Sequence, residues 1–247
     1  MSSDLKRSVE FCLKNLKDRG VKRINVVAPS TSSKKTEQAA ATKSLIPELD
    51  INSNLKQYTD LEDVKKDLGN CERCQLGGMR TNIVFGEGNP KAELMFIGEG
   101  PGEDEDKTGR PFVGRAGQLL TKIIEAMGLK REDVYIANIV KCRPPGNRAP
   151  VDEEIIKCAP YLMGQISVIK PKIIVTLGSP ATCTLFNKKI KISLVRGEFY
   201  DWNYGIKLMP TFHPAYLLRN PKDKGLVWED MKKVMSLLGL KPKHTGE

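Results

Sequence analysis

Short apolar runs alternate with segments of helical spacing along most of this chain. The runs predict buried strands at residues 94–97, 134–140, 173–177 and 207–209. Apolar positions three and four residues apart predict helices at 61–68, 117–127, 152–169, 180–186 and 224–238. Alternating strands and helices predict an α/β fold whose mostly parallel sheet is covered on both faces, with ligands bound at the carboxyl ends of the strands.

Local signals mark where some of these elements begin. Thr59 and Glu62 have the spacing of a capping box at the start of the first helix. Ser179 is placed to cap the helix that follows the third strand. Residues 199–204 are expected to form a hairpin or loop beside the sheet.

The segment LMFIGEGPGEDEDKTGRPFVGRAGQLL, residues 94–120, joins a strand to a helix through a long loop rich in glycine and proline. Such a turn exposes backbone N–H groups at the mouth of a sheet and suits a flat or anionic ligand. It matches neither GxxxxGK[ST] nor, in register, GxGxxG, which disfavours a nucleotide cofactor. The alternative is an ordinary connection carrying a mobile acidic loop, and we expect Asp104 and Asp106 to face solvent.

The chain divides into four parts by composition. Residues 1–27 predict an amphipathic helix region, and residues 28–58 are rich in Ser, Thr, Ala and Lys, as is typical of a flexible linker. The compact domain is expected at 59–240, followed by a polar tail at 241–247. The first helix either docks a protein partner or packs on the main domain.

Charge narrows the possible partners. Forty Lys and Arg against thirty Asp and Glu give a net charge of +10, which favours a polyanion such as nucleic acid or a membrane surface. We find neither an apolar run long enough to span a bilayer nor the core of a signal peptide, so we expect a soluble, intracellular protein. In that reducing compartment, metal binding explains cysteines better than disulfides do.

Four cysteines form two pairs. Cys71 and Cys74 stand in a CERC motif, and fifteen residues separate Cys142 from Cys158. Four thiolates suit a structural zinc or an iron–sulfur cluster, and the spacing does not choose between them. The alternative is four unligated thiols, while Cys12 and Cys183 fall outside the set. If the four cysteines bind one metal group, residues 143–157 form a basic loop that is fixed at both ends.

Three motifs and the cysteine spacing resemble the fourth, iron–sulfur family of uracil-DNA glycosylases. The motifs are GEGPGEDEDKTGRPFVGRAGQLL, NIVKCRPPGNRAP and HPAYLLRNP, and they span roughly residues 60–240 in the family's order. The resemblance implies a three-layer α/β/α sandwich in a prokaryotic cytoplasm. It also implies a [4Fe–4S] cluster on the four cysteines. The expected reaction is monofunctional removal of uracil from single- or double-stranded DNA, by a chain that we expect to be a monomer.

The resemblance also assigns roles to residues. Phe112 is implied as the platform on which the base stacks, Asn138 as the reader of its edge, and His213 as the catalytic donor to uracil O2. The expected uracil-binding residues are Gly98, Glu99, Gly100, Phe112, Asn138 and His213. Glu99 and Glu105 are the candidates for orienting water. The alternatives are a core phenylalanine, a strand-end cap and a structural histidine.

Contacts with DNA are expected from residues near these motifs. Leu217 occupies the position where this superfamily inserts a wedge into the duplex, although a helix packing on the core is the alternative. Expected phosphate contacts are Arg110, Arg115, Arg143 and Arg219. Two other functions remain open. One is a non-catalytic nucleic-acid-binding module that a bound metal cross-links, and the other is a repair scaffold that acts through its N-terminal helix.

Overall fold

The computed structural model describes residues 58–241. The predicted N-terminal helix region, nearly all of the linker and most of the tail lie outside the described residues. Within 58–241 the chain forms a six-stranded sheet in the order β1-β3-β2-β4-β6-β5. The four inner strands are parallel, while β1 and β5 pair antiparallel at the two edges. The predicted mostly parallel sheet is confirmed.

The predicted elements appear close to their expected bounds. The strands are β1 Glu87–Gly88, β2 Leu94–Gly98, β3 Tyr135–Asn138, β4 Ile173–Leu177, β5 Tyr200–Asp201 and β6 Lys207–Thr211. The helices are α2 Leu61–Leu68, α3 Glu103–Thr108, α4 Arg115–Ala126, α5 Asp152–Ile169, α6 Gly178–Phe186, α7 Ile192–Val195, α8 Pro214–Arg219 and α9 Lys224–Leu238. Among the described residues, none of these helices combines the length and apolar character needed to span a membrane.

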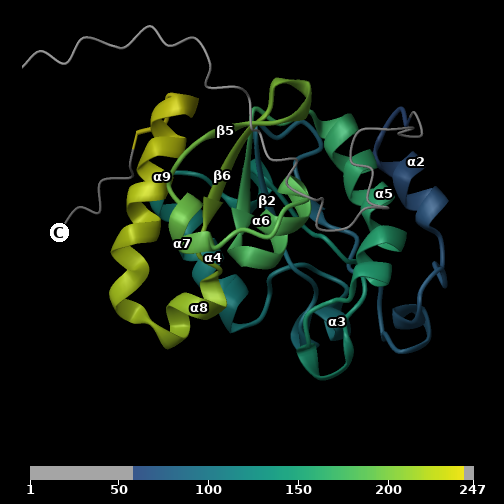
Figure 1. Cartoon of the computed structure of the whole chain (residues 1–247). Helices are drawn as coiled ribbons and strands as arrows, with labels where there is room; N and C mark the ends of the chain where they lie inside the picture. The colour runs from purple at the N-terminus through teal and green to yellow at the C-terminus, as the bar shows by residue number, and fades with distance from the viewer. Residues whose placement is uncertain (1–57, 242–247) are drawn as a thin grey trace, which may run out of the picture. The chain divides into compact units, whose positions relative to one another are not determined.

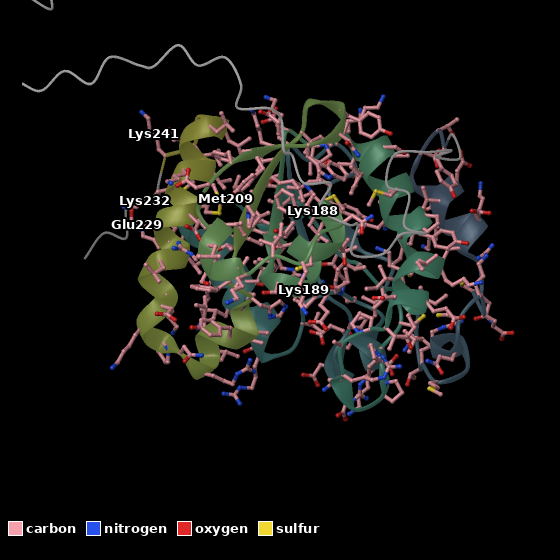
Figure 2. All side chains as sticks on the ribbon, in the orientation of Figure 1. Lys188, Lys189, Met209, Glu229, Lys232 and Lys241 are labelled. Carbon is pink, nitrogen blue, oxygen red and sulfur yellow. The ribbon has the colours of Figure 1, made fainter. Side chains whose placement is uncertain are left out.

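Alternate residues of each inner strand enter opposite cores. In β2, Met95 and Ile97 pack with apolar residues of α5 and α6, whereas Leu94 and Phe96 pack with α4 and α9. The helices therefore cover both faces of the sheet, which makes the fold a three-layer α/β/α sandwich (Figure 1). Met209 of β6 belongs to the core layer beneath α9 (Figure 2).

Two predicted caps are wrong. Asp60, not Thr59, caps α2, because its side chain accepts a hydrogen bond from the Asp63 N–H at 2.9 Å. Ser179 lies inside α6, which begins at Gly178 directly after β4. Gly178 has a φ of +85°, and this backbone conformation turns the chain from strand to helix without an intervening loop.

The acidic segment between β2 and α4 was predicted to be one long loop, but it contains the helix α3. Asp106 is 5 % exposed rather than solvent-facing, and its carboxylate accepts from the Thr81 N–H at 2.9 Å and from the Asn82 N–H at 3.3 Å. Asp104 is exposed, as expected. A buried carboxylate that receives backbone donors fixes α3 against the segment that precedes β1.

Candidate active site

A pocket of about 510 Å³ opens at the carboxyl ends of the parallel strands, where the topology predicts a site. Asn138 ends β3, the loop from Glu99 follows β2, and His213 follows β6. The lining includes Glu99, Glu105, Phe112, Asn138, His213 and Arg219. The fold therefore brings together the three principal residues that the sequence singled out, although they lie far apart along the chain.

Asn138 forms the polar floor of this pocket. It is 1 % exposed, and its Oδ1 is the buried side-chain polar atom of residues 58–241 that has no hydrogen-bond partner. Gly98 lies opposite it on β2, and a Cβ there would lie 2.5 Å from Oδ1. A buried acceptor without a donor costs about 1–3 kcal/mol, so a ligand donor has a prepared place here.

Phe112 lies beside Asn138. Its ring is so close to Gly98 that a Cβ on the glycine would lie 2.5 Å from Cζ, and its centroid is 5.7 Å from that of the His213 ring. Phe112 is 6 % exposed and has a φ of +52°. This left-handed conformation costs a residue with a Cβ about 1–2 kcal/mol, so the surrounding structure must hold it in place.

His213 presents one defined ring nitrogen to the pocket. Its Nδ1 accepts a hydrogen bond from the Ala215 N–H at 3.1 Å at the start of α8, so the neutral ring carries its proton on Nε2. Burial, and then the positive charge of Arg219, lower the pKa of His213 to about 4, while the charge of Glu105 opposes them. The imidazole is therefore a neutral donor at physiological pH.

The loop after β2 lies close to the end of β3. The Glu99 carbonyl accepts from the Val140 N–H at 3.2 Å, and burial raises the pKa of the Glu99 carboxyl. A Cβ at Gly100 would lie 2.8 Å from Val140 Cγ2. The backbone can run this close to Val140 only because Gly100 has no side chain.

Glu105 has a structural task that the sequence did not reveal. Its Oε1 accepts from the N–H groups of Val113 and Gly114, both at 2.9 Å, and its Oε2 accepts from the Gly102 N–H at 3.1 Å. The carboxylate thus ties the start of α3 to the loop that carries Phe112. Its position three residues after Gly102, the N-cap of α3, was the available sequence signal.

The four predicted ligand cysteines are brought together away from the pocket. Burial raises the pKa of the Cys142 thiol, with smaller contributions from Cys74 and Cys71 nearby. Burial also raises the pKa of Cys158 to about 12, and Cys142 and Cys74 again contribute. All four are free thiols. Among residues 58–241, no three Cys, His, Asp or Glu side chains form a group that could hold a single metal ion.

Comparison with known proteins identifies the family. The model of the uracil DNA glycosylase superfamily matches residues 85–232. The type-4 uracil-DNA glycosylase of Saccharolobus solfataricus is 52 % identical over 74 % of this chain and 88 % of its own length. The chain belongs to the type-4 uracil-DNA glycosylases. Enzymes of the same name from Thermotoga maritima and Archaeoglobus fulgidus are 50 % and 44 % identical, and each match covers 94 % of the relative.

The predicted family, fold and enzyme class are thereby confirmed, and uracil excision in DNA repair is the supported activity.

The four arginines of this glycosylase that were predicted to contact DNA lie in different surroundings from one another. Arg219 is exposed and lines the pocket, and Arg115 is exposed at the start of α4. Arg143 donates to Asn147 Oδ1 at 2.8 Å, whereas Arg110 pairs with Glu87 at 2.6 Å beside a second surface hollow.

The wedge expected at Leu217 needs correction. Leu217 is 1 % exposed and belongs to the core cluster that covers the α4 face of the sheet. In the short helix α8, Pro214 and Leu217 are three residues apart and both face inward, which leaves Leu218 partly exposed. The alternative, a helix packing on the core, describes this residue in the structure.

Proposed function

We propose that this pocket receives a uracil nucleotide turned out of DNA and that the enzyme hydrolyses its N-glycosidic bond. The products are free uracil and an abasic site, with no strand cleavage. The observation that carries the proposal is the buried, unpaired Oδ1 of Asn138, which faces the same pocket as Phe112 and His213. An unpaired acceptor beside an aromatic ring suits a flat base whose edge donates a proton.

Asn138 identifies the base. Its Oδ1 accepts from uracil N3–H, and its amide NH₂ donates to uracil O4. Cytosine presents the reverse pattern, an acceptor at N3 and a donor at N4, so it leaves both groups buried and unpaired. Phe112 supports the ring by stacking, which contributes about 1–3 kcal/mol per base. The backbone of Gly98, Glu99 and Gly100 forms the cradle at the opposite side of the base.

His213 stabilises the departing base. Cleavage leaves negative charge on uracil and positive charge on the sugar, and the Nε2–H of His213 donates to uracil O2 as that charge develops. The hydrogen bond from Ala215 to Nδ1 holds the tautomer that makes this donation possible. Glu99 orients the attacking water or stabilises the sugar cation, and Glu105 supports the same step by holding the Phe112 loop.

The cysteines Cys71, Cys74, Cys142 and Cys158 bind a [4Fe–4S] cluster. A set of four thiols fits this group by its donor chemistry, and a structural zinc ion with the same four ligands is the alternative. When bound, the cluster is a structural cross-link. It joins the segment after α2 to the loop after β3 and to α5.

Residues 59–240 form the glycosylase domain, while residues 1–27 and nearly all of 28–58 lie outside the described residues. The packing of α2 against α5 supports a domain boundary before residue 61. DNA follows the basic surface around the pocket. There Arg219, Arg115 and Arg143 contact phosphates, and Arg110 contributes only if it leaves Glu87.

The proposal is tested with oligonucleotides that contain one uracil, single-stranded or opposite each of the four bases. The full chain is expected to release free uracil, and strand breaks should appear only after alkali opens the abasic site. Identical oligonucleotides with thymine or cytosine in place of uracil serve as controls. Strand breaks before alkali, or no uracil from any substrate, would contradict the proposed reaction.

His213 gives the enzyme a defined pH dependence. Since its folded pKa of about 4 lies below the ordinary value of 6.5, the unfolded chain binds more protons between these values. The free energy of unfolding should therefore fall as the pH drops from about 6.5 to about 4. Denaturant unfolding at several pH values measures this slope, and His213→Gln should reduce it. The excision rate should show no step near pH 6.5; a step there would contradict a neutral His213.

A further inference from the structure

The backbone on both sides of Phe112 is held unusually tightly. Besides its φ of +52°, its carbonyl group lies against α4, where a Cβ at Gly117 would be only 2.0 Å from the Phe112 carbonyl carbon and oxygen. The loop thus folds back onto the first turn of the helix. A conformation that is both unfavourable and closely packed persists only where other groups fix it.

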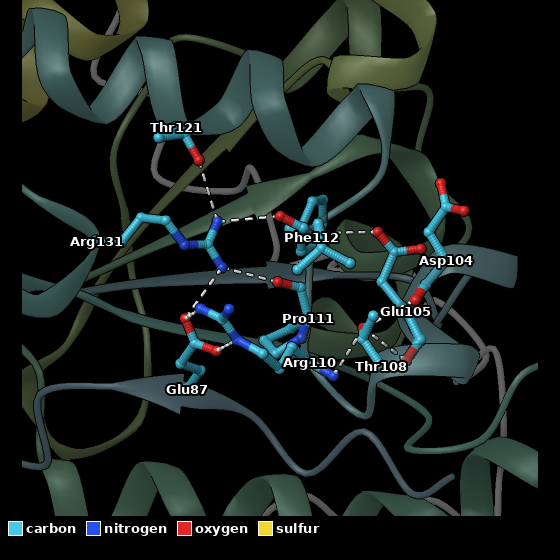
Figure 3. A network of polar contacts seen from close by, with 10 residues as sticks. Glu87, Asp104, Glu105, Thr108, Arg110, Pro111, Phe112, Thr121 and Arg131 are labelled. Carbon is cyan, nitrogen blue, oxygen red and sulfur yellow. Dashed lines mark hydrogen bonds and ion pairs between the residues drawn. The ribbon is translucent and has the colours of Figure 1, made fainter. Parts of the chain in front are cut away.

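Arg131 binds the two peptide groups that flank the Phe112 Cα. Its Nη2 donates to the Pro111 carbonyl at 2.8 Å, and its Nη1 donates to the Phe112 carbonyl at 3.0 Å (Figure 3). Because φ and ψ describe how these two peptide planes are turned about one Cα, a single rigid guanidinium that binds both carbonyls fixes both angles. The direction of the Phe112 side chain follows from them.

Further contacts fix the guanidinium itself. Nη1 also donates to Thr121 Oγ1 of α4 at 3.2 Å, and Nη2 lies 3.4 Å from Glu87 Oε1 of β1. Arg110 holds the same Glu87 carboxylate at 2.6 Å and 2.9 Å. The hydrogen bond from Arg110, together with the charge of Arg131, lowers the pKa of Glu87. The Arg131 side chain is 19 % exposed, so most of this network is shielded from water.

We propose that Arg131 is a positioning residue for uracil excision. It keeps the Phe112 ring beside Asn138, so that the base stacks and presents its edge in one arrangement. This inference rests on the proposed stacking role of Phe112. Arg131 lies in the 3-10 turn Arg131–Asp133, which leads into the strand β3 that carries the base reader Asn138, so adjoining elements hold the stacking platform and the base reader.

The test compares Arg131→Gln, Arg131→Lys and the control Lys130→Gln in the full chain. Lys130 is exposed and pairs only with exposed Glu132 among the described side chains, so its loss removes a neighbouring charge without touching the loop. We expect Arg131→Gln to lower single-turnover uracil excision by about 10- to 100-fold, as a small misplacement of a reacting group does. Affinity for DNA should change little, because phosphate contacts dominate it.

The Arg131→Lys variant keeps the positive charge, but a lysine cannot bind both carbonyls at once, so this variant should also excise uracil slowly. If Arg131→Gln fails to unfold cooperatively, the comparison uses Arg131→Lys in its place. Inhibition by free uracil should weaken in both. The control Lys130→Gln should match the wild type within about twofold. A wild-type rate in both Arg131 variants, or an equal loss in Lys130→Gln, would overturn the proposal.

A double-mutant cycle with Phe112→Leu shows whether Arg131 acts through the ring. If it does, Phe112→Leu/Arg131→Gln should be no slower than Phe112→Leu alone, whereas independent roles would multiply the two losses and overturn the inference. The cycle also separates two failures. A wild-type rate in Phe112→Leu would refute the stacking platform itself. A slow Phe112→Leu beside a fast Arg131→Gln would refute only the positioning role.

Discussion

Replacing Asn138 with alanine is expected to slow uracil release by about 10²- to 10³-fold, the loss typical of a precisely directed hydrogen-bonding group in an active site. The change removes both the unpaired Oδ1 and the NH₂ that together match uracil. It also leaves the N3–H and O4 of a bound uracil buried without partners. Single-turnover release from a uracil oligonucleotide measures the effect.

DNA affinity should be affected far less than the rate, since contacts with phosphates supply most of it. Asn89→Ala is a suitable control, because the Asn89 side chain caps a surface turn by accepting from the Lys91 N–H at 2.9 Å, outside the pocket. The control should keep the full rate. If Asn138→Ala also keeps it, Asn138 does not read the base.

The second large effect is expected from Cys71→Ser. Loss of one of four cluster ligands should remove iron and the brown colour, because ligand binding and folding are coupled in such sites. We expect the free energy of unfolding to fall by at least about 4 kcal/mol, the range typical of a lost structural metal. For a domain of this size, that corresponds to roughly 8–16 °C in unfolding temperature.

Cys183→Ser provides the matched control. The Cys183 thiol lies outside the ligand set and exchanges hydrogen bonds with the backbone of Ile190, at 3.4 Å to the carbonyl and 3.3 Å from the N–H. A serine hydroxyl can replace both, so iron content should be unchanged and the loss of stability below about 1 kcal/mol. Full iron content and stability in Cys71→Ser would refute the cluster assignment. Zinc in place of iron in the wild type would support the alternative metal.

The sequence predicted the elements that depend on local pattern. The bounds of α5, α9 and β4 match the predicted ranges, since apolar periodicity and helix stops are read directly from neighbouring residues. The edge strand β1 was missed, because two residues are too few to establish a period. The edge strand β5 lies within 199–204, where a hairpin or loop was expected, and it pairs antiparallel with β6. The helix α3 was missed because its composition is acidic and carries no apolar stripe.

The residues that support the site were harder to predict than those that form it. Motifs pointed to Phe112, Asn138 and His213, whose residue types suit the chemistry. Nothing near Arg131 in the sequence indicates that its side chain holds the Phe112 loop, because its partners there are backbone groups of another segment. The capping-box spacing of Glu105 signals its bond to Gly102 but not its bonds to the Phe112 loop. The opposite holds for Leu217. Its position in the motif predicted a wedge on the surface, but its side chain is buried in the core.

Residue order was therefore enough to establish the family, the alternating α/β architecture and the types of side chain available for base excision. Folding alone settled which backbone conformation Phe112 adopts, which tautomer His213 carries and which oxygen of Asn138 is left without a donor. The physical reason is the distance along the sequence over which each effect acts. Periodicity acts between residues a few positions apart, whereas these three features depend on groups brought within hydrogen-bonding distance only by the assembled sheet and its covering helices.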